Sequence, residues 1–142
     1  MKYPIVLFLM ITGSIMVMAG GEAKIVFKKT DYDLGTIERG KPAVCQFIFT
    51  NVGDKPLKIE RTATSCGCLS IYHSSGYVES GESGMITVKY NSNKIGRIGK
   101  IIIVVSNSNG YEKTILRIKG NIVPGRDSKI KRFLRKLFFA KR

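Results

Sequence analysis

Hydrophobic and polar residues alternate with a period of two along the middle of the chain, from Lys24 to Val123. Short runs of β-branched and aromatic residues recur there, and Gly, Pro, Asn or Asp bounds each run. No long helical period interrupts them, so the pattern predicts an all-β domain, and about seven strands of this kind are typical of a sandwich. The expected strands cover residues 24–29, 43–51, 56–63, 69–73, 84–90, 100–107 and 112–119.

The alternation also assigns faces to the side chains. In residues 43–51, the set Cys45, Phe47 and Phe49 is in phase and apolar, which predicts an inward face. Val44 and Ile48 fall on the other face. We interpret Cys45 as core packing, because a free cysteine behaves as a small buried hydrophobe. The same argument places a second group inward: Ile86, Val88, Tyr90, Ile101, Ile103, Val105, Leu116 and Ile118.

The first 23 residues differ from this pattern. Lys2 gives a short positive start, residues 5–18 form an uncharged apolar run, and small residues follow at Ala19 and Ala23. The run is too short for a comfortable membrane span, so we expect a secretory signal peptide over residues 1–23, cleaved after Ala19 or after Ala23. An uncleaved membrane anchor is the alternative. No cysteine lies beside either site, which argues against a lipoprotein.

The carboxyl-terminal tail, residues 124–142, changes to a helical period. Its eight basic residues and one acidic residue give +7, half of the chain's net charge of +14. Apolar side chains recur at helical spacing and form one stripe of an expected amphipathic helix: Ile130, Phe133, Leu134, Leu137 and Phe138. Basic residues, among them Lys131, Arg132 and Arg135, cover the rest of its surface.

A basic amphipathic helix with aromatic residues suits the surface of an anionic membrane. Two alternatives stay open: the stripe docks on the sandwich or on a partner protein, or the tail stays disordered with its charges solvated. We expect no nucleic-acid partner, because export argues against one and no stacking platform is visible.

The chain has three cysteines, two of them in the sequence Cys66-Gly67-Cys68. In an oxidising compartment an odd number leaves at least one thiol free, paired between molecules or bound to something. An extended backbone would place the Cβ atoms of Cys66 and Cys68 roughly 6.5–7 Å apart, whereas a disulfide needs about 3.5–4.5 Å. A bridge between them therefore requires a bend at Gly67. Alternatively, Cys45 pairs with one of them across the sheets and leaves one exposed thiol.

A metal site is the alternative chemistry for this pair. Two thiolates suit a soft ion such as Cu(I), with His73 as a third ligand and Met85 as a further soft one. A structural zinc site wants four ligands and is not supported. A thiol-redox catalyst usually carries Cys-x-x-Cys on a helix, and that setting is missing. Neither a Gly-x-Ser-x-Gly elbow nor paired carboxylates occur, so we expect no enzyme and no cofactor.

Six motifs occur in an order that resembles a known family. They read DLGTIERG, FIFTNVGDKPLKI, SCGC, VESGESGMITVKYN, GRIGKIIIVVSN and LRIKGNI. Over about residues 25–123 the chain resembles the bacterial domain of unknown function 1573 family and, more distantly, the domains of the ASPM, SPD-2 and Hydin group. Leu69 and Ser80 depart from the family pattern, which commonly has threonine and proline there.

The resemblance implies an immunoglobulin-like β-sandwich in an exported bacterial protein, with no established reaction. We therefore expect three parts: a signal peptide over 1–23, a sandwich over 24–123 and a basic tail over 124–142. The leading hypothesis is a binding or scaffolding module of the periplasm or cell envelope, with an envelope protein as partner and the tail at the membrane. The alternative is a soft-metal or thiol-redox protein that uses Cys66 and Cys68.

Overall fold

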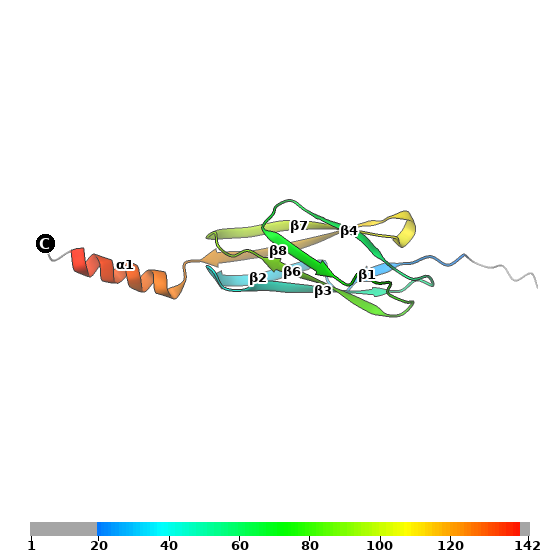
Figure 1. Ribbon diagram of the computed structural model, residues 1–142, viewed down its shortest axis with the longest axis horizontal. Coiled ribbons are helices and arrows are strands. Elements are labelled where there is room, and N and C mark those ends of the chain that lie inside the picture. The colour runs from blue at the N-terminus through cyan, green and yellow to red at the C-terminus, as the bar shows by residue number, and fades with distance from the viewer. Residues whose placement is uncertain (1–19, 140–142) are drawn as a thin grey trace, which may run out of the picture.

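Two four-stranded sheets pack face to face to form the body of the molecule (Figure 1). The computed structural model describes residues 20–139, including the side chains of 20–125 and 130–136, so the expected signal-peptide run 5–18 lies outside the described residues. The first sheet has the order β1-β3-β6-β5 and the second β2-β8-β7-β4. The strands are β1 Ile25–Phe27, β2 Asp31–Glu38, β3 Ala43–Asn51, β4 Ile59–Thr64, β5 Leu69–His73, β6 Ser83–Tyr90, β7 Gly96–Ser106 and β8 Lys113–Val123.

The all-β sandwich expected from the alternation is confirmed, with one strand more than the seven expected. The additional strand is β2, which pairs in parallel with β8, whereas the neighbouring β7 and β8 are antiparallel. Its register shifts between Asp33 and Thr36, and Gly35 there has φ 65°. This irregularity breaks the period of two within β2, which is why its sequence does not read as a strand.

The core lies between the two sheets. In β3, Cys45, Phe47 and Phe49 are 3%, 1% and 1% exposed, which confirms their predicted inward face. Val44 and Ile48 point outward and are 46% and 44% exposed, as expected. The core is therefore built mainly from one face of each strand, as the alternation predicts.

The predicted face of residues 100–107 is wrong for two isoleucines. Ile101 and Ile103 are 46% and 38% exposed, while Ile102 and Val104 are buried. The run Ile-Ile-Ile-Val-Val is apolar in both phases, so alternation alone gives no choice between its two faces. Pairing with β8 decides the face: Ile102 lies opposite the buried Leu116, and Ile103 lies opposite the exposed Ile115.

The two ends of the sandwich differ in which loops they contain. The near end consists of residues 39–42, 91–95 and 124–125, next to the point where the helix α1 (Arg126–Phe139) leaves the last strand. The far end consists of residues 52–58, 74–82 and 107–112. Figure 1 shows α1 continuing beyond the near end and lying on neither sheet, so the predicted carboxyl-terminal helix is confirmed and the sandwich does not cover it.

Asn51 ties the far end together from the end of β3. Its side chain is fully buried, and its Nδ2 donates hydrogen bonds to the carbonyls of Lys55 (2.8 Å) and Val78 (2.9 Å). Its Oδ1 accepts from the backbone N–H of Gly53 at 3.0 Å and of Lys24 at 3.3 Å. One side chain thus joins the turn after β3, the loop before β6 and the segment that leads into β1.

Candidate functional site: the disulfide turn and the basic helix

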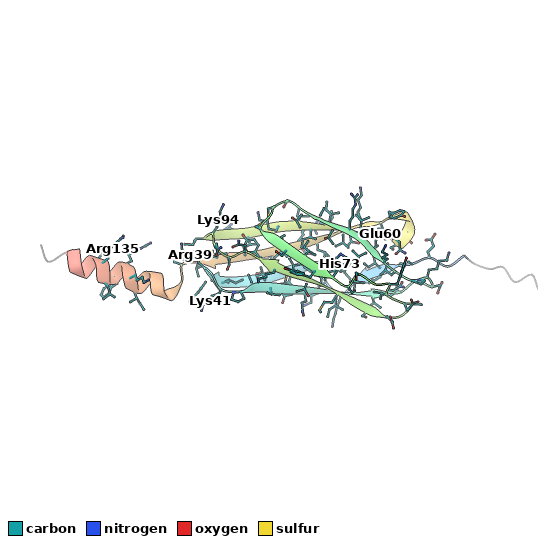
Figure 2. All side chains as sticks on the ribbon, viewed as in Figure 1. Arg39, Lys41, Glu60, His73, Lys94 and Arg135 are labelled. Atoms are coloured by element: carbon teal, nitrogen blue, oxygen red, sulfur yellow. A yellow bond between two sulfur atoms is a disulfide. The ribbon has the colours of Figure 1, made fainter. Side chains whose placement is uncertain are left out.

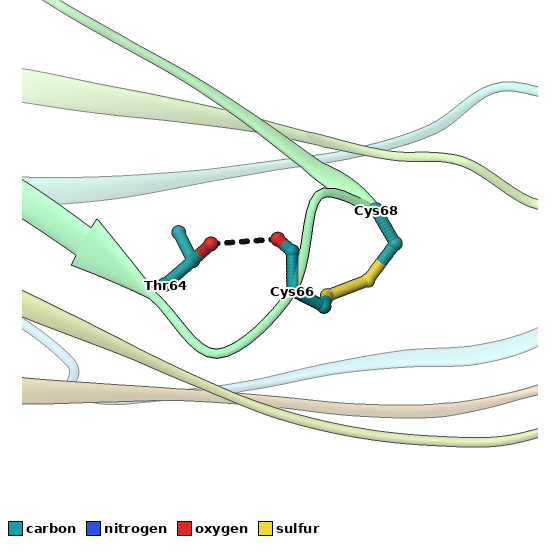
Figure 3. Close-up of a disulfide and its surroundings, with 3 residues drawn as sticks. All are labelled: Thr64, Cys66 and Cys68. Carbon is teal, nitrogen blue, oxygen red and sulfur yellow. Dashed lines mark hydrogen bonds between the residues drawn. A yellow bond between two sulfur atoms is a disulfide. The ribbon is translucent and has the colours of Figure 1, made fainter.

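Cys66 and Cys68 form a disulfide in the turn between β4 and β5 (Figure 3). Their Cα atoms are 5.3 Å apart, so the turn supplies the bend that a bridge across one residue requires. The hydroxyl of Thr64 donates to the carbonyl of Cys66 at 2.7 Å, and the N–H of Asn91 donates to the carbonyl of Cys68 at 2.9 Å. Both cysteines are half-buried and pack against the core, so the bridge closes this turn against the sandwich.

The alternative bridge from Cys45 to the pair is not formed. Cys45 lies opposite Val88 on β6, and Val88 lies opposite Ile71 on β5. Two strand spacings of about 4.8 Å therefore separate Cys45 from β5, more than the roughly 4.4–6.8 Å between Cα atoms that a disulfide spans. One thiol is left unpaired, as expected, and it is that of Cys45. This thiol is buried and not exposed, since Cys45 is only 3% exposed.

Burial also removes the reactivity of this thiol. It raises the pKa of Cys45 from 9.0 to about 11, because the apolar core disfavours the thiolate. At neutral pH the group is therefore protonated and has neither the charge nor the access that a nucleophile or a mixed disulfide needs. None of the three cysteines, all of them in the described part of the chain, is an exposed thiol that could link the protein to a partner.

The four groups proposed as soft-metal ligands do not come together at one site. The disulfide leaves Cys66 and Cys68 without thiolates, and His73 lies at the opposite end of β5, roughly 16 Å away for five extended residues. Its Nδ1 is 3.0 Å from the carbonyl of Ser74. Met85 and His73 both line a shallow hollow on the outer face of the first sheet, beside Ile48 and away from the disulfide. Among the residues that the structure describes, no three His, Cys, Asp or Glu side chains gather as a metal site.

Thiol counting tests this arrangement directly. We expect no thiol of the folded protein to react with a thiol reagent, one to react after unfolding in denaturant, and three after unfolding with reductant. The single thiol is Cys45, so the variant Cys45→Ala should give none without reductant. A reactive thiol in the folded protein, or three in denaturant alone, would contradict the pairing.

The helix α1 presents an apolar stripe that nothing in the described chain covers. Ile130, Phe133 and Leu134 are 53%, 64% and 45% exposed. Four basic residues accompany them with no acidic residue between 130 and 136: Lys131, Arg132, Arg135 and Lys136. Leu137 and Phe138 belong to the helix, but their side chains lie outside the described ones. In this structure the tail does not dock on its own sandwich, which is one of the alternatives that the sequence leaves open.

No helix in the described part of the chain combines the length and the apolar character needed to cross a bilayer. Basic residues alternate with the apolar ones along the sequence of α1, so cations flank its apolar stripe. The described side chains of α1 are therefore both apolar and cationic, and all of them are exposed.

The near end adds basic residues that the sequence reasoning missed. Arg39, Lys41 and Lys94 are exposed there, and Figure 2 shows them at the end of the sandwich beside α1. Backbone contacts bring their loops together: the N–H of Gly40 donates to the carbonyl of Ser92 at 3.2 Å. Because more than fifty positions separate Lys41 from Lys94, only the folded pairing of the strands reveals this cluster.

A family model described as "Protein of unknown function (DUF1573)" matches residues 25–122. The match begins at β1 and ends within β8, so it covers the sandwich and leaves α1 outside. It confirms the resemblance drawn from the ordered motifs. No curated protein shows a significant match to the chain.

Solved structures of other proteins share the fold. The ASH/PapD-like domain 7 of human CEP192 has 11% identity and a TM-score of 0.64, covering 74% of this chain and 89% of that one. A protein of unknown function from Porphyromonas gingivalis W83 has 16% identity, a TM-score of 0.61 and coverages of 70% and 46%. The Vibrio cholerae VesB protease has 15% identity, a TM-score of 0.60 and coverages of 69% and 32%. This chain thus spans less than half of the last two, and the likeness shows a PapD-like, immunoglobulin-like sandwich, as expected.

Proposed function

The chain belongs to the DUF1573 family of proteins of unknown function, and we propose that it is a non-enzymatic binding or scaffolding module of the bacterial cell envelope. In this proposal α1 holds the module at an anionic membrane surface, and the sandwich is left free to contact an envelope protein. The fold shared with a PapD-like domain is consistent with such a module.

One observation carries the membrane part of the proposal: the apolar stripe of α1 is exposed and flanked by four cations while the helix extends away from the sandwich. Each basic residue near an anionic leaflet contributes on the order of 1 kcal/mol. Four of them give about 4 kcal/mol, roughly a thousandfold in partitioning, before the apolar side chains contribute. An isolated helix of this length is marginal in water, so a surface that buries the stripe also stabilises the helix.

Vesicle co-sedimentation tests the attachment. We expect the full chain to sediment with anionic vesicles, and a version that ends at Val123 to stay in the supernatant. Binding should weaken with added salt and be slight on neutral vesicles, because the attraction is screened over about 8 Å at physiological ionic strength.

A matched variant separates the apolar from the charged contribution. Phe133→Ser keeps every charge of α1 but removes the most exposed described side chain of the stripe, which is 64% exposed. We expect it to bind more weakly than the full chain and more tightly than the truncated version. Equal sedimentation of the full and truncated chains would remove α1 as the attachment.

Envelope location is tested separately. Fractionation of cells that produce the full chain should recover it with the periplasm and membranes, whereas a version without residues 1–19 should stay in the cytoplasm. Recovery of both in the cytoplasm would contradict export.

A further inference from the structure

We propose that the near end of the sandwich is a second lipid-contact surface, which binds the same anionic bilayer as α1. The membrane then holds the module by its near end, and the far end is directed away from the lipid when the chain bends at Pro124 and Gly125, because α1 otherwise continues the long axis of the sandwich (Figure 1). This inference rests on the proposed attachment through α1 and adds an orientation to it. Its ligand is the phosphate-bearing surface of an anionic bilayer.

The first argument is the length of the connection. The strand β8 ends at Val123 and α1 begins at Arg126, so only Pro124 and Gly125 lie between them. Three residue steps span at most roughly 10 Å even when fully extended. That reach is close to the Debye length of about 8 Å at physiological salt. A surface that holds α1 therefore keeps the near end within the range of its electrostatic field.

The second argument is that the near end is built as one platform. The N–H of Arg39 donates to the carbonyl of Val123 at 2.8 Å, which fixes this loop beside the exit to α1. The hydroxyl of Ser92, itself 5% exposed, donates to the carbonyl of Lys41 at 2.5 Å. These bonds hold the loops of Arg39, Lys41 and Lys94 against each other, so three cations share one face of the molecule at little further cost in backbone entropy.

An apolar residue accompanies these cations. Ile95 follows Lys94 directly and is 53% exposed. An exposed aliphatic side chain beside cationic ones matches the composition of α1 itself, and this mixture suits a membrane interface, where apolar groups enter the headgroup region and charges face phosphates.

The third argument is the distribution of charge between the two ends. The near end, 39–42, 91–95 and 124–125, contains three basic residues and no acidic one, a charge of +3, with Glu38 the adjacent acid on β2. The far end, 52–58, 74–82 and 107–112, has two basic residues, Lys55 and Lys58. Its four acidic residues bring its charge to −2: Asp54, Glu79, Glu82 and Glu112. An anionic surface attracts the first end and repels the second.

Two triple variants of the full chain test the inference by co-sedimentation with anionic vesicles. One is Arg39→Gln/Lys41→Gln/Lys94→Gln at the near end. The other is Lys24→Gln/Lys55→Gln/Lys113→Gln, which removes the same charge around the far end. We expect the near-end triple to lower the partition constant by about 10- to 100-fold and the far-end triple to leave it within about twofold. Melting temperatures of both triples check that the sandwich is intact.

A fluorescence reporter gives a second readout. The chain contains no tryptophan, so Ile95→Trp and Tyr77→Trp each introduce a single tryptophan, at the near and the far end respectively. We expect anionic vesicles to shift the emission of Ile95→Trp to shorter wavelength and to make it quenchable by brominated lipid, while Tyr77→Trp stays unchanged.

The outcomes distinguish this inference from the attachment on which it rests. If the full chain binds vesicles, the two triples bind equally and Ile95→Trp does not shift, then α1 attaches the module and the near-end contact is wrong. If the full chain does not bind vesicles at all, both proposals fail. If the near-end triple binds vesicles as well as the full chain does but no longer binds an acidic envelope protein, these cations contact a protein partner. That result would overturn the lipid contact.

Discussion

Replacing Asn51 with alanine is expected to lower the free energy of unfolding by about 3–5 kcal/mol, a large fraction of the roughly 5–15 kcal/mol by which native domains are stable. The variant loses four hydrogen bonds at a fully buried position. It also leaves the N–H of Gly53 without the partner that Asn51 provides in a buried setting, and an unsatisfied group of this kind costs about 1–3 kcal/mol. The carbonyl of Val78 keeps its second hydrogen bond, from the N–H of Leu57 at 2.9 Å.

The melting temperature measures this loss, and we expect a decrease of about 10–20 °C. Asn121→Ala is the matched control, because it removes the same amide from an exposed position on β8. Asn51→Asp keeps the acceptor oxygen but removes both donated bonds and buries a carboxylate, so it should also destabilise strongly. A melting temperature for Asn51→Ala close to that of the Asn121 control would show that the buried amide contributes little.

The second large effect concerns the segment that leads into β1. We expect a protein that begins at Lys24 to be about 2 kcal/mol less stable than one that begins at Gly20. Ala23 is 4% exposed and belongs to the core, and the carbonyl of Glu22 accepts a hydrogen bond from the N–H of Asp54 at 3.0 Å. A chain that begins at Lys24 lacks both and places a charged amino group beside the buried side chain of Asn51.

This difference bears on the two cleavage sites expected from the sequence. Cleavage after Ala23 would remove a core residue, whereas cleavage after Ala19 keeps the segment from Gly20 onward. We therefore expect the exported protein to begin at Gly20. Its intact mass, together with thermal melts of purified chains that begin at Gly20 and at Lys24, checks both statements. An exported form that begins at Lys24 and melts as high as the longer one would contradict them.

How far the sequence predicts the fold depends on whether each strand has one apolar face or two. β3 has one, so alternation correctly assigns Cys45 to the core. The central run of β7 is apolar on both faces, and only its register with β8 decides that Ile102, and not Ile101, points inward. β2 is not recognisable from alternation, because its bulge at Gly35 shifts the phase within eight residues.

The candidate sites divide in a similar way. The helix α1 is predicted from local periodicity, since its stripe repeats within a few residues. The cationic near end is not, because it combines loops that are distant in sequence. The pairing of Cys66 with Cys68 also escapes prediction: the motif allows a bend at Gly67, but only the turn between β4 and β5 brings the two Cα atoms to 5.3 Å.

The position of β8 determines how the sandwich responds to a mechanical load. This strand of eleven residues lies inside its sheet, bonded to β2 on one side and β7 on the other, and it leads through two residues into α1. Figure 1 shows the helix leaving from the end of this strand. Interstrand hydrogen bonds run across the strand direction, so a pull on α1 along β8 loads both ladders in shear. Many bonds then resist together, whereas a pull on an edge strand from the side would break them one at a time.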